Sequence, residues 1–318
     1  MRTLIIVSAL GLLAAATTTS AQPRPMTTLD LISIDRVSDP QVSPDGSRVT
    51  FVLSELDLEA DGRLTDLWIT NVAGGTPRRL TTDPAGAFAP RWSPDGDTLY
   101  FLSTRSGSSQ VWRLNPNGGA PEAVTDLPLS VADLTVSPDG RSLAVSIEVF
   151  TDCDSLACTA DRLRGRDEGP RTGQLFDSVF VRHWDTWEDG RRSHVFVLPI
   201  TGGPAVDVMR DLDADSPSVP FGGASDFAFT PDSRSIVLSS KVLSGSEKEP
   251  WSTNYDLWLA PADGSTPPRN LTDANDARDA GPLFSPDGTT LAYRAMERPG
   301  FESDRYRIML RALSLIHI

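Results

Sequence analysis

A short run of charged and aromatic residues is the densest candidate for binding chemistry in this 318-residue sequence. It contains Arg182, His183, Asp185 and Glu188, interleaved with Trp184 and Trp187. Acidic groups beside aromatic rings can hold an ammonium group through charge and cation–π contact, and an arginine can pair with a carboxylate. We therefore predict that the four charged residues contact a substrate. The alternative is an ordinary hairpin whose tryptophans pack on the neighbouring strands and whose charges are solvated.

The sequence lacks the residues that would perform hydrolysis beside such a binding segment. The pattern G-x-S-x-G, which places a nucleophilic serine on a sharp strand-to-helix turn, does not occur in it. Serine-rich stretches at 106–109 and 244–246 have the wrong spacing, and neither His183 nor His194 comes with a credible nucleophile. We assign no catalytic residue to this chain and expect no cofactor.

Cys153 and Cys158 are the two cysteines of the sequence. In an oxidising compartment the simplest interpretation is a local disulfide that braces a long loop. A zinc site is the alternative, but it needs further ligands, and the spacing of His183 and His194 matches no zinc pattern. The sequence therefore predicts a disulfide and no metal site.

A repeated turn shows which elements must position these residues. The tetrapeptide S-P-D-G begins at Ser43, Ser93, Ser137 and Ser285, and a degenerate T-P-D-S begins at Thr230. Proline presets φ at the second turn position, serine is expected to accept a hydrogen bond from the backbone two residues on, and glycine adopts the left-handed conformation. The turns recur after 50, 44, 93 and 55 residues, and three of these intervals lie near the 40–50-residue period of propeller blades. The long third interval indicates one repeat with an insertion.

The surroundings of each turn repeat in a fixed order. An apolar run precedes the turn, a stretch of alternating β-formers follows it, and a third stretch carries an aromatic residue at Trp68, Trp112, Phe196 or Trp258. A glycine turn and a short fourth stretch complete the repeat. Four short strands per repeat predict an all-β fold, a β-propeller of four-stranded blades, with about five present and the last incomplete. A β-sandwich of hairpins would explain the alternation but not the fixed order.

The two ends of the chain are predicted to lie outside the propeller. Residues 1–21 have the positive start, apolar stretch and small-residue end of a cleaved signal peptide, which predicts a periplasmic or secreted protein without a membrane anchor. Residues 22–36 form a lead-in, and 37–312 the partial propeller, with the insertion at 150–191 in the third blade. The last six residues, 313–318, match a translated sequencing adapter and are predicted to be a non-native tail. The net charge of −14 disfavours nucleic acid as a partner.

Several segments resemble one known family. The start of the repeats, R-V-S-D-P-Q-V-S-P-D-G from Arg36, the stretch G-G-x-P-x-x-L-T from Gly74, and the insertion segment F-V-R-H-W-D-T-W from Phe180 are similar to secreted bacterial peptidases of the prolyl oligopeptidase family. The similarity spans residues 27–312 and is closest to the dipeptidyl aminopeptidase and acylaminoacyl peptidase branch. It implies a propeller that precedes an α/β-hydrolase domain, absent from this chain, and that limits access to short peptide substrates.

Two other functions remain open. A periplasmic propeller of the Tol–Pal kind would bind partner proteins without chemistry, but in that protein a separate domain precedes the blades. A sugar-active propeller would need carboxylates that converge on the central channel, and no spacing here supports that. Some relatives hold a peptide's amino terminus with adjacent propeller glutamates; this sequence has no Glu-Glu pair, so that device is not transferred.

Overall fold

The computed structural model describes residues 24–313, except 170–172, 174, 177, 178, 180, 244 and 245. The chain divides into two compact units, and the first ends at Ile34 while the second begins at Asp35. In the first, the short helix α1 (Thr28–Ser33) lies within the predicted lead-in. A capping box starts it, because Thr27 Oγ1 accepts from the Asp30 N–H and the Asp30 carboxylate accepts from the Thr27 N–H. The predicted signal peptide lies outside the described residues.

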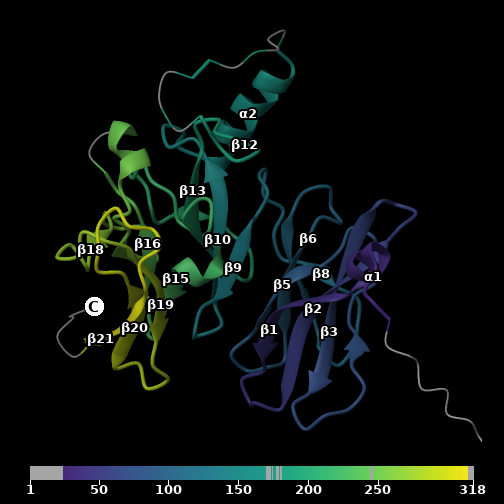
Figure 1. The fold of residues 1–318 in the computed structure, drawn as a ribbon. Helices are drawn as coiled ribbons and strands as arrows, with labels where there is room; N and C mark the ends of the chain where they lie inside the picture. The colour runs from purple at the N-terminus through teal and green to yellow at the C-terminus, as the bar shows by residue number, and fades with distance from the viewer. Residues whose placement is uncertain are drawn as a thin grey trace, which may run out of the picture. The chain divides into compact units, whose positions relative to one another are not determined.

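The second unit consists of consecutive antiparallel sheets (Figure 1). The first blade contains β1 (Arg36–Val42), β2 (Arg48–Asp57), β3 (Gly62–Asn71) and β4 (Arg78–Arg79). The second contains β5 (Phe88–Trp92), β6 (Leu99–Ser103), β7 (Gln110–Leu114) and β8 (Glu122–Ala123). The third contains β9 (Asp133–Val136), β10 (Ser142–Val149), β13 (Arg192–Pro199) and β14 (Val206–Asp207).

The remaining blades follow the same order. The fourth contains β15 (Phe227–Phe229), β16 (Ser235–Ser240), β17 (Asp256–Pro261) and β18 (Arg269–Asn270). The fifth contains β19 (Asp279–Phe284), β20 (Thr290–Ala295) and β21 (Arg307–Ala312). The short 3₁₀ helices η1 (Ala224–Asp226) and η2 (Ser246–Trp251) lie in connections. The predicted all-β fold of four-stranded blades, with a fifth that shows three strands in the described residues, is confirmed.

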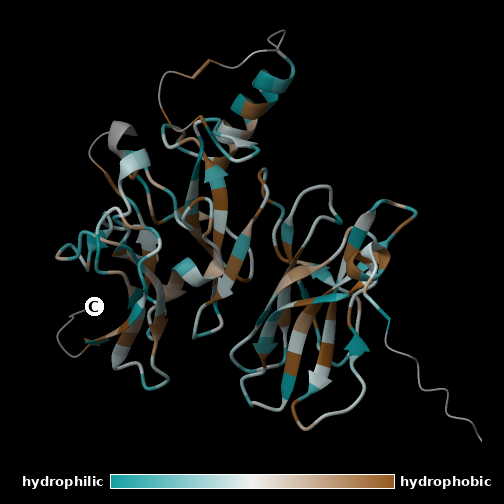
Figure 2. Cartoon of the chain, viewed as in Figure 1, coloured by the Kyte–Doolittle hydropathy of each residue, from teal (hydrophilic) through white to brown (hydrophobic). Residues whose placement is uncertain are grey.

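The hydrophobic core is a series of clusters, each between two consecutive blades. Leu99 and Phe101 of β6 pack toward the first blade, whereas Tyr100 and Leu102 of the same strand pack toward the third. Because both faces of such a strand are covered, β6 is buried along its whole length. Figure 2 shows apolar residues along the second and third strands of the blades, such as β2, β3 and β10. The fifth blade is joined in the same way, and Leu313 packs with Leu291 and its fourth-blade neighbours. The rest of the predicted tail lies outside the described residues.

The S-P-D-G turns have one local geometry. In the first, Ser43 Oγ donates to Asp45 Oδ1 at 2.6 Å and accepts from the Arg48 N–H at 2.9 Å. Asp45 Oδ1 in turn accepts from the backbone N–H of Ser47, at 3.0 Å. The expected bond from the N–H two residues after Ser43, that of Asp45, is not found among the described residues; Ser43 Oγ accepts from the Arg48 N–H, five residues on, instead. Hydrogen bonds from Ser43 and Ser47 lower the pKa of Asp45 to about 2.

A second repeated bond joins the third and fourth strands of a blade. Thr81 Oγ1 donates to the buried Asp66 carboxylate at 2.7 Å and accepts from the Leu67 N–H at 3.0 Å. The same pairing occurs at Gln110–Thr125 and Asp256–Thr272. The repeated threonine, two residues beyond the fourth strand, is therefore structural: it ties the end of this short strand to the blade.

The strand polarity defines two ends of the propeller. Because successive strands alternate in direction, the S-P-D-G turns and the glycine turns lie at one end, which we name the turn end. The connections between second and third strands, and between consecutive blades, lie at the other, the loop end. The loop end carries the long connections at 150–191, 208–226, 241–255 and 296–306.

Candidate functional site

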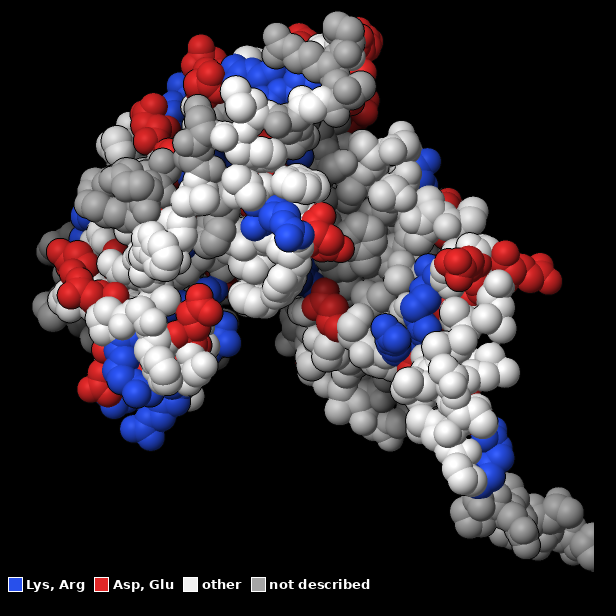
Figure 3. All heavy atoms as spheres, turned by 45° about the horizontal axis from the view of Figure 1, so that its top comes forward, with Lys and Arg blue, Asp and Glu red and all other residues white. Residues whose placement is uncertain are grey.

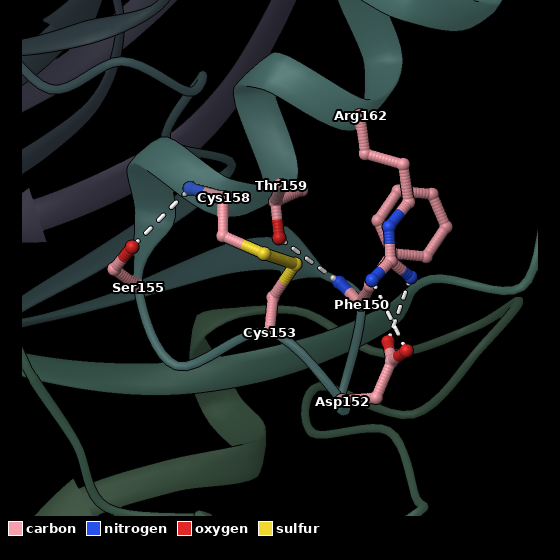
Figure 4. The surroundings of a disulfide bond; sticks show 7 residues. All are labelled: Phe150, Asp152, Cys153, Ser155, Cys158, Thr159 and Arg162. Atoms are coloured by element: carbon pink, nitrogen blue, oxygen red, sulfur yellow. Dashed lines mark hydrogen bonds and ion pairs between the residues drawn. A yellow bond between two sulfur atoms is a disulfide. The ribbon is translucent and has the colours of Figure 1, made fainter.

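The insertion between β10 and β13 contains a braced helix, α2 (Leu156–Asp167). Ser155 caps it, with Oγ accepting from the Cys158 N–H at 3.2 Å. Cys153 and Cys158, the predicted disulfide pair, are bonded, and Figure 4 shows this bond beside the cap. The disulfide joins Cys153, which precedes the helix, to Cys158 in the first turn of α2.

Phe150 anchors α2 to the blade. Its ring is buried, and the guanidinium groups of Arg162 and Arg166 each lie 4.5 Å from its centroid. Arg162 also forms two hydrogen bonds to the Asp152 carboxylate, at 2.7 and 3.0 Å (Figure 4). Cation–π and bidentate contacts of this kind hold a mainly polar helix that buries little apolar surface.

The four predicted substrate-contact residues lie together on one small hairpin. Its strands are β11 (Arg182–His183) and β12 (Thr186–Trp187), paired antiparallel, with Trp184 and Asp185 as the two turn residues. Trp184 has φ of +48°, in the left-handed region that such a tight turn requires. The hairpin therefore brings the four residues close together in the fold.

Two of the four predicted residues are engaged with each other, and a third with its own hairpin. His183 Nδ1 lies 3.1 Å from Glu188 Oε1, and both side chains are partly buried. Arg182 donates to the Trp184 carbonyl oxygen and lies 5.8 Å from the Trp187 ring centroid. These contacts lie within the hairpin, and none of them involves the carboxylate of Asp185.

Asp185 is exposed and forms no hydrogen bond or ion pair with the residues that the structure describes. Beside it, Trp184 packs edge-on against Phe221, with centroids 5.3 Å apart, and both rings are mostly exposed. Trp187 stacks on Phe176 at 5.6 Å. The tryptophans therefore pack on other loop aromatics rather than on the blade. A carboxylate beside exposed rings can bind an ammonium group.

The structure also places His194, one of the two histidines it describes. The side chain is 1 % exposed, Nδ1 lies 2.9 Å from Asp207 Oδ2, and Nε2 lies 3.0 Å from the Leu212 carbonyl oxygen. It replaces the aspartate or glutamine of the other blades, and Met209 replaces the paired threonine, with Sδ 3.4 Å from the Val195 N–H. With both ring nitrogens occupied, His194 is structural. Among the described residues no group of His, Cys, Asp and Glu is arranged to hold a metal ion.

Exposed aromatic residues concentrate at the loop end. Within the described ranges, the exposed Trp, Phe and Tyr side chains are Trp184, Trp187, Phe221, Trp251, Phe301 and Tyr306. All six lie in loop-end connections, and none lies at the turn end. Sequence reasoning found the two tryptophans of the hairpin but missed Phe221 and Trp251. The available signal was a large aromatic residue in a long polar connection.

On the face drawn in Figure 3, acidic and basic side chains are interspersed rather than gathered by sign. None of the helices in the part of the chain that is described is long and apolar enough to cross a membrane. The exposed aromatic residues among those described distinguish the loop end from the turn end.

Comparison with known proteins identifies relatives of this fold. Residues 34–154 match the TolB β-propeller domain. The chain is 32% identical to dipeptidyl-peptidase 5 of Porphyromonas gingivalis over 89% of its own length and 40% of the relative's. It is 28% identical to dipeptidyl-peptidase 5 of Aspergillus fumigatus, over 93% and 43%. The chain thus spans about two fifths of the length of these relatives.

Solved structures show the same fold at lower sequence identity. Acylaminoacyl peptidase of Pyrococcus horikoshii matches with a TM-score of 0.63 and 16% identity, over 89% of this chain and 39% of that one. Puromycin hydrolase matches with a TM-score of 0.56 and 15% identity, over 88% and 37%. The fold is therefore that of a β-propeller, residues 34–154 of the chain match the TolB β-propeller domain, and the chain is similar in sequence to dipeptidyl-peptidases 5.

Proposed function

We propose that this chain is the substrate-gating propeller of a secreted serine peptidase that acts on short peptides, in the manner of dipeptidyl or acylaminoacyl peptidases. The observation that carries the proposal is the 32% identity to dipeptidyl-peptidase 5 over 89% of the chain. The propeller itself contributes no triad, so hydrolysis belongs to an α/β-hydrolase domain of the longer protein.

The strand polarity supports a specific role for the loop end. The chain enters the first blade at Arg36, at the loop end, and the fourth strand of every complete blade also runs back to that end. A domain that follows the propeller in sequence therefore begins at the loop end. The insertion hairpin and the six exposed aromatic residues lie on the same end, where a peptide passing between propeller and catalytic domain would meet them.

In this proposal the hairpin binds the substrate. Asp185, exposed and unpaired within the described residues, would attract the ammonium group of a peptide, and the Trp184–Phe221 pair would contact its first side chains. Arg182 and the His183–Glu188 pair hold the hairpin in place. The periplasm or the exterior of the cell is the compartment in which the Cys153–Cys158 bond persists.

The test uses the longer protein that contains the hydrolase domain. We expect Asp185→Asn to lower kcat/KM for dipeptidyl nitroanilides about 5–10-fold, mainly through KM, because one charge contact is lost. Asp97→Asn is the matched control, since Asp97 is an exposed carboxylate at the turn end. Equal kcat/KM for both variants would remove Asp185 from substrate binding, while activity of the parent would still support the peptidase assignment.

A further inference from the structure

A hollow of about 240 Å³ lies at the loop end between the fourth and fifth blades. Three connections line it, through Trp251, Ser252, Thr253, Asp276, Pro299 and Gly300. Binding sites for whole small molecules usually measure about 300–1,000 Å³. The hollow therefore has room for one side chain rather than for a complete ligand.

Partly buried ion pairs fix the first wall. Arg192 of β13 donates through Nη1 and Nη2 to both carboxylate oxygens of Glu249, at 3.1 and 3.0 Å, and also pairs with Asp215 at 3.0 Å. Lys241 Nζ donates to the carbonyl oxygens of Glu249 and Ser252, at 2.9 and 3.3 Å. These bonds connect η2 to the third blade through Arg192 and to the fourth blade through Lys241. Trp251 is 83% exposed, although the bonds to Glu249 and Ser252 hold the backbone on both sides of it.

The opposite wall is fixed by a bond between the blades. The Gly300 N–H donates to Thr253 Oγ1 at 2.8 Å, across the hollow's edge. Arg298, which precedes the lining residue Pro299, is already engaged, because it pairs with Asp304 at 2.9 Å and lies 4.0 Å from the Phe301 ring centroid. The described residues that line the hollow include no lysine or arginine.

The charged and aromatic groups in the lining are complementary to a cation. Asp276 is exposed, and its carboxylate forms no hydrogen bond or ion pair with any residue the structure describes. A guanidinium group can stack on an indole while it donates to a carboxylate, and an ammonium group can make both contacts more weakly. We propose that this hollow binds the arginine or lysine side chain of a peptide, at a site separate from the insertion hairpin. The proposal rests on the proposed function only in taking that peptide to be a substrate.

The binding test needs no hydrolysis. The purified chain is titrated with acetyl-arginine amide, and the indole N–H of Trp251 and the backbone N–H of Gly300 are followed by NMR. We expect saturable shifts at both positions and at least about fivefold weaker binding of acetyl-citrulline amide, which has a similar shape without the charge. Asp276→Asn should weaken binding of the arginine ligand about fivefold, because one charge-assisted contact is lost. Asp273→Asn, an exposed carboxylate outside the lining, should leave it unchanged.

Clear outcomes would overturn the site. Shifts that do not saturate, equal affinity for the arginine and citrulline amides, or an Asp276→Asn variant that binds like the parent would each contradict it. The comparison of the two ligands uses the unmodified chain, so it remains decisive even if a variant folds poorly. A full-length protein that cleaves dipeptides normally while these titrations fail would remove the hollow and leave the proposed function standing.

Discussion

Ser233 of the fourth blade accepts a hydrogen bond at 3.1 Å from the backbone N–H of Asp139 in the third. Ser233 stands where the other turns have glycine, and its φ of +61° lies in the left-handed region. In the glycine turns, the glycine faces the proline of the preceding turn instead: Gly96 faces Pro44, Gly140 faces Pro94, and Gly288 faces Pro231. The turns thus form a continuous series of contacts between blades.

At Ser233, the free-energy cost of the left-handed backbone opposes the stabilisation from this hydrogen bond. Ser233→Gly removes the strain and the bond together, whereas Ser233→Ala removes only the bond. We expect the alanine variant to be less stable than the glycine variant by about 1 kcal/mol in urea unfolding. An alanine variant as stable as the glycine variant would show that the left-handed backbone carries no cost here.

Alanine substitutions at Gly288 and Gly46 distinguish the cost of a left-handed backbone from the cost of steric crowding. Both have φ near +70°, but a Cβ at Gly288 would lie 3.0 Å from Pro231 Cβ, whereas nothing lies within 4 Å at Gly46. Alanine should therefore cost about 1–2 kcal/mol at Gly46 and roughly 1 kcal/mol more at Gly288. Urea midpoints of the two variants test this, and equal losses would show that neighbouring turns do not touch.

Asp279 should make stability depend on pH above 4. Burial raises its pKa to about 6; the side chain is 1 % exposed, and Oδ2 has no hydrogen bond to the described residues. The folded chain then binds more protons than the unfolded chain between pH 4 and 6, so this group lowers stability as pH rises through that window. Asp279→Asn should flatten the profile there and stabilise the protein at pH 7.5 by on the order of 2 kcal/mol.

Thermal unfolding at pH 4.5 and 7.5 measures this difference. Asp273→Asn serves as the control, because Asp273 is exposed. The turn aspartates have the opposite sign and act lower: the pKa of Asp45 is about 2, so its contribution is lost only as pH falls below about 4. Parallel profiles for the parent and Asp279→Asn between pH 4 and 6 would contradict the prediction.

The outer strand of the fifth blade should promote self-association. β21 pairs with β20 and with no other strand in the described ranges, and Ile308 and Leu310 are 79% and 73% exposed. An apolar edge of this kind can pair with a second chain. We expect light scattering to show a mass that rises with protein concentration and falls when both residues are changed to lysine. Val72→Lys, at an exposed apolar position in the first blade, should not change the mass.

The repeat could be predicted from the sequence because its determinants are local. Each S-P-D-G turn closes its own hydrogen bonds within six residues, so five similar turns indicate five similar sheets. The Arg48 N–H was not predicted as the donor to Ser43, because the turn type alone does not fix which backbone N–H a serine hydroxyl reaches. Residues 182–188 could be chosen as candidates because charge and aromatic content are visible in sequence, and their contact with a substrate stays a prediction.

The rest of the candidate site depends on contacts between distant segments. Trp184 meets Phe221 across 37 positions, and the hollow joins Trp251 to Gly300 through two blades. Arg192 and Glu249, which are 57 positions apart, form the ion pair beside Trp251, and no local pattern indicates it. Such pairings arise from the order of the blades and required the structure.

The genomic reading frame beyond codon 312 tests the peptidase assignment most directly. The account predicts that the frame completes the propeller and then encodes an α/β-hydrolase domain with G-x-S-x-G on a strand–turn–helix, followed by the aspartate and histidine of a triad. A stop codon after one or two further blades, with no nucleophile-bearing domain, would contradict it.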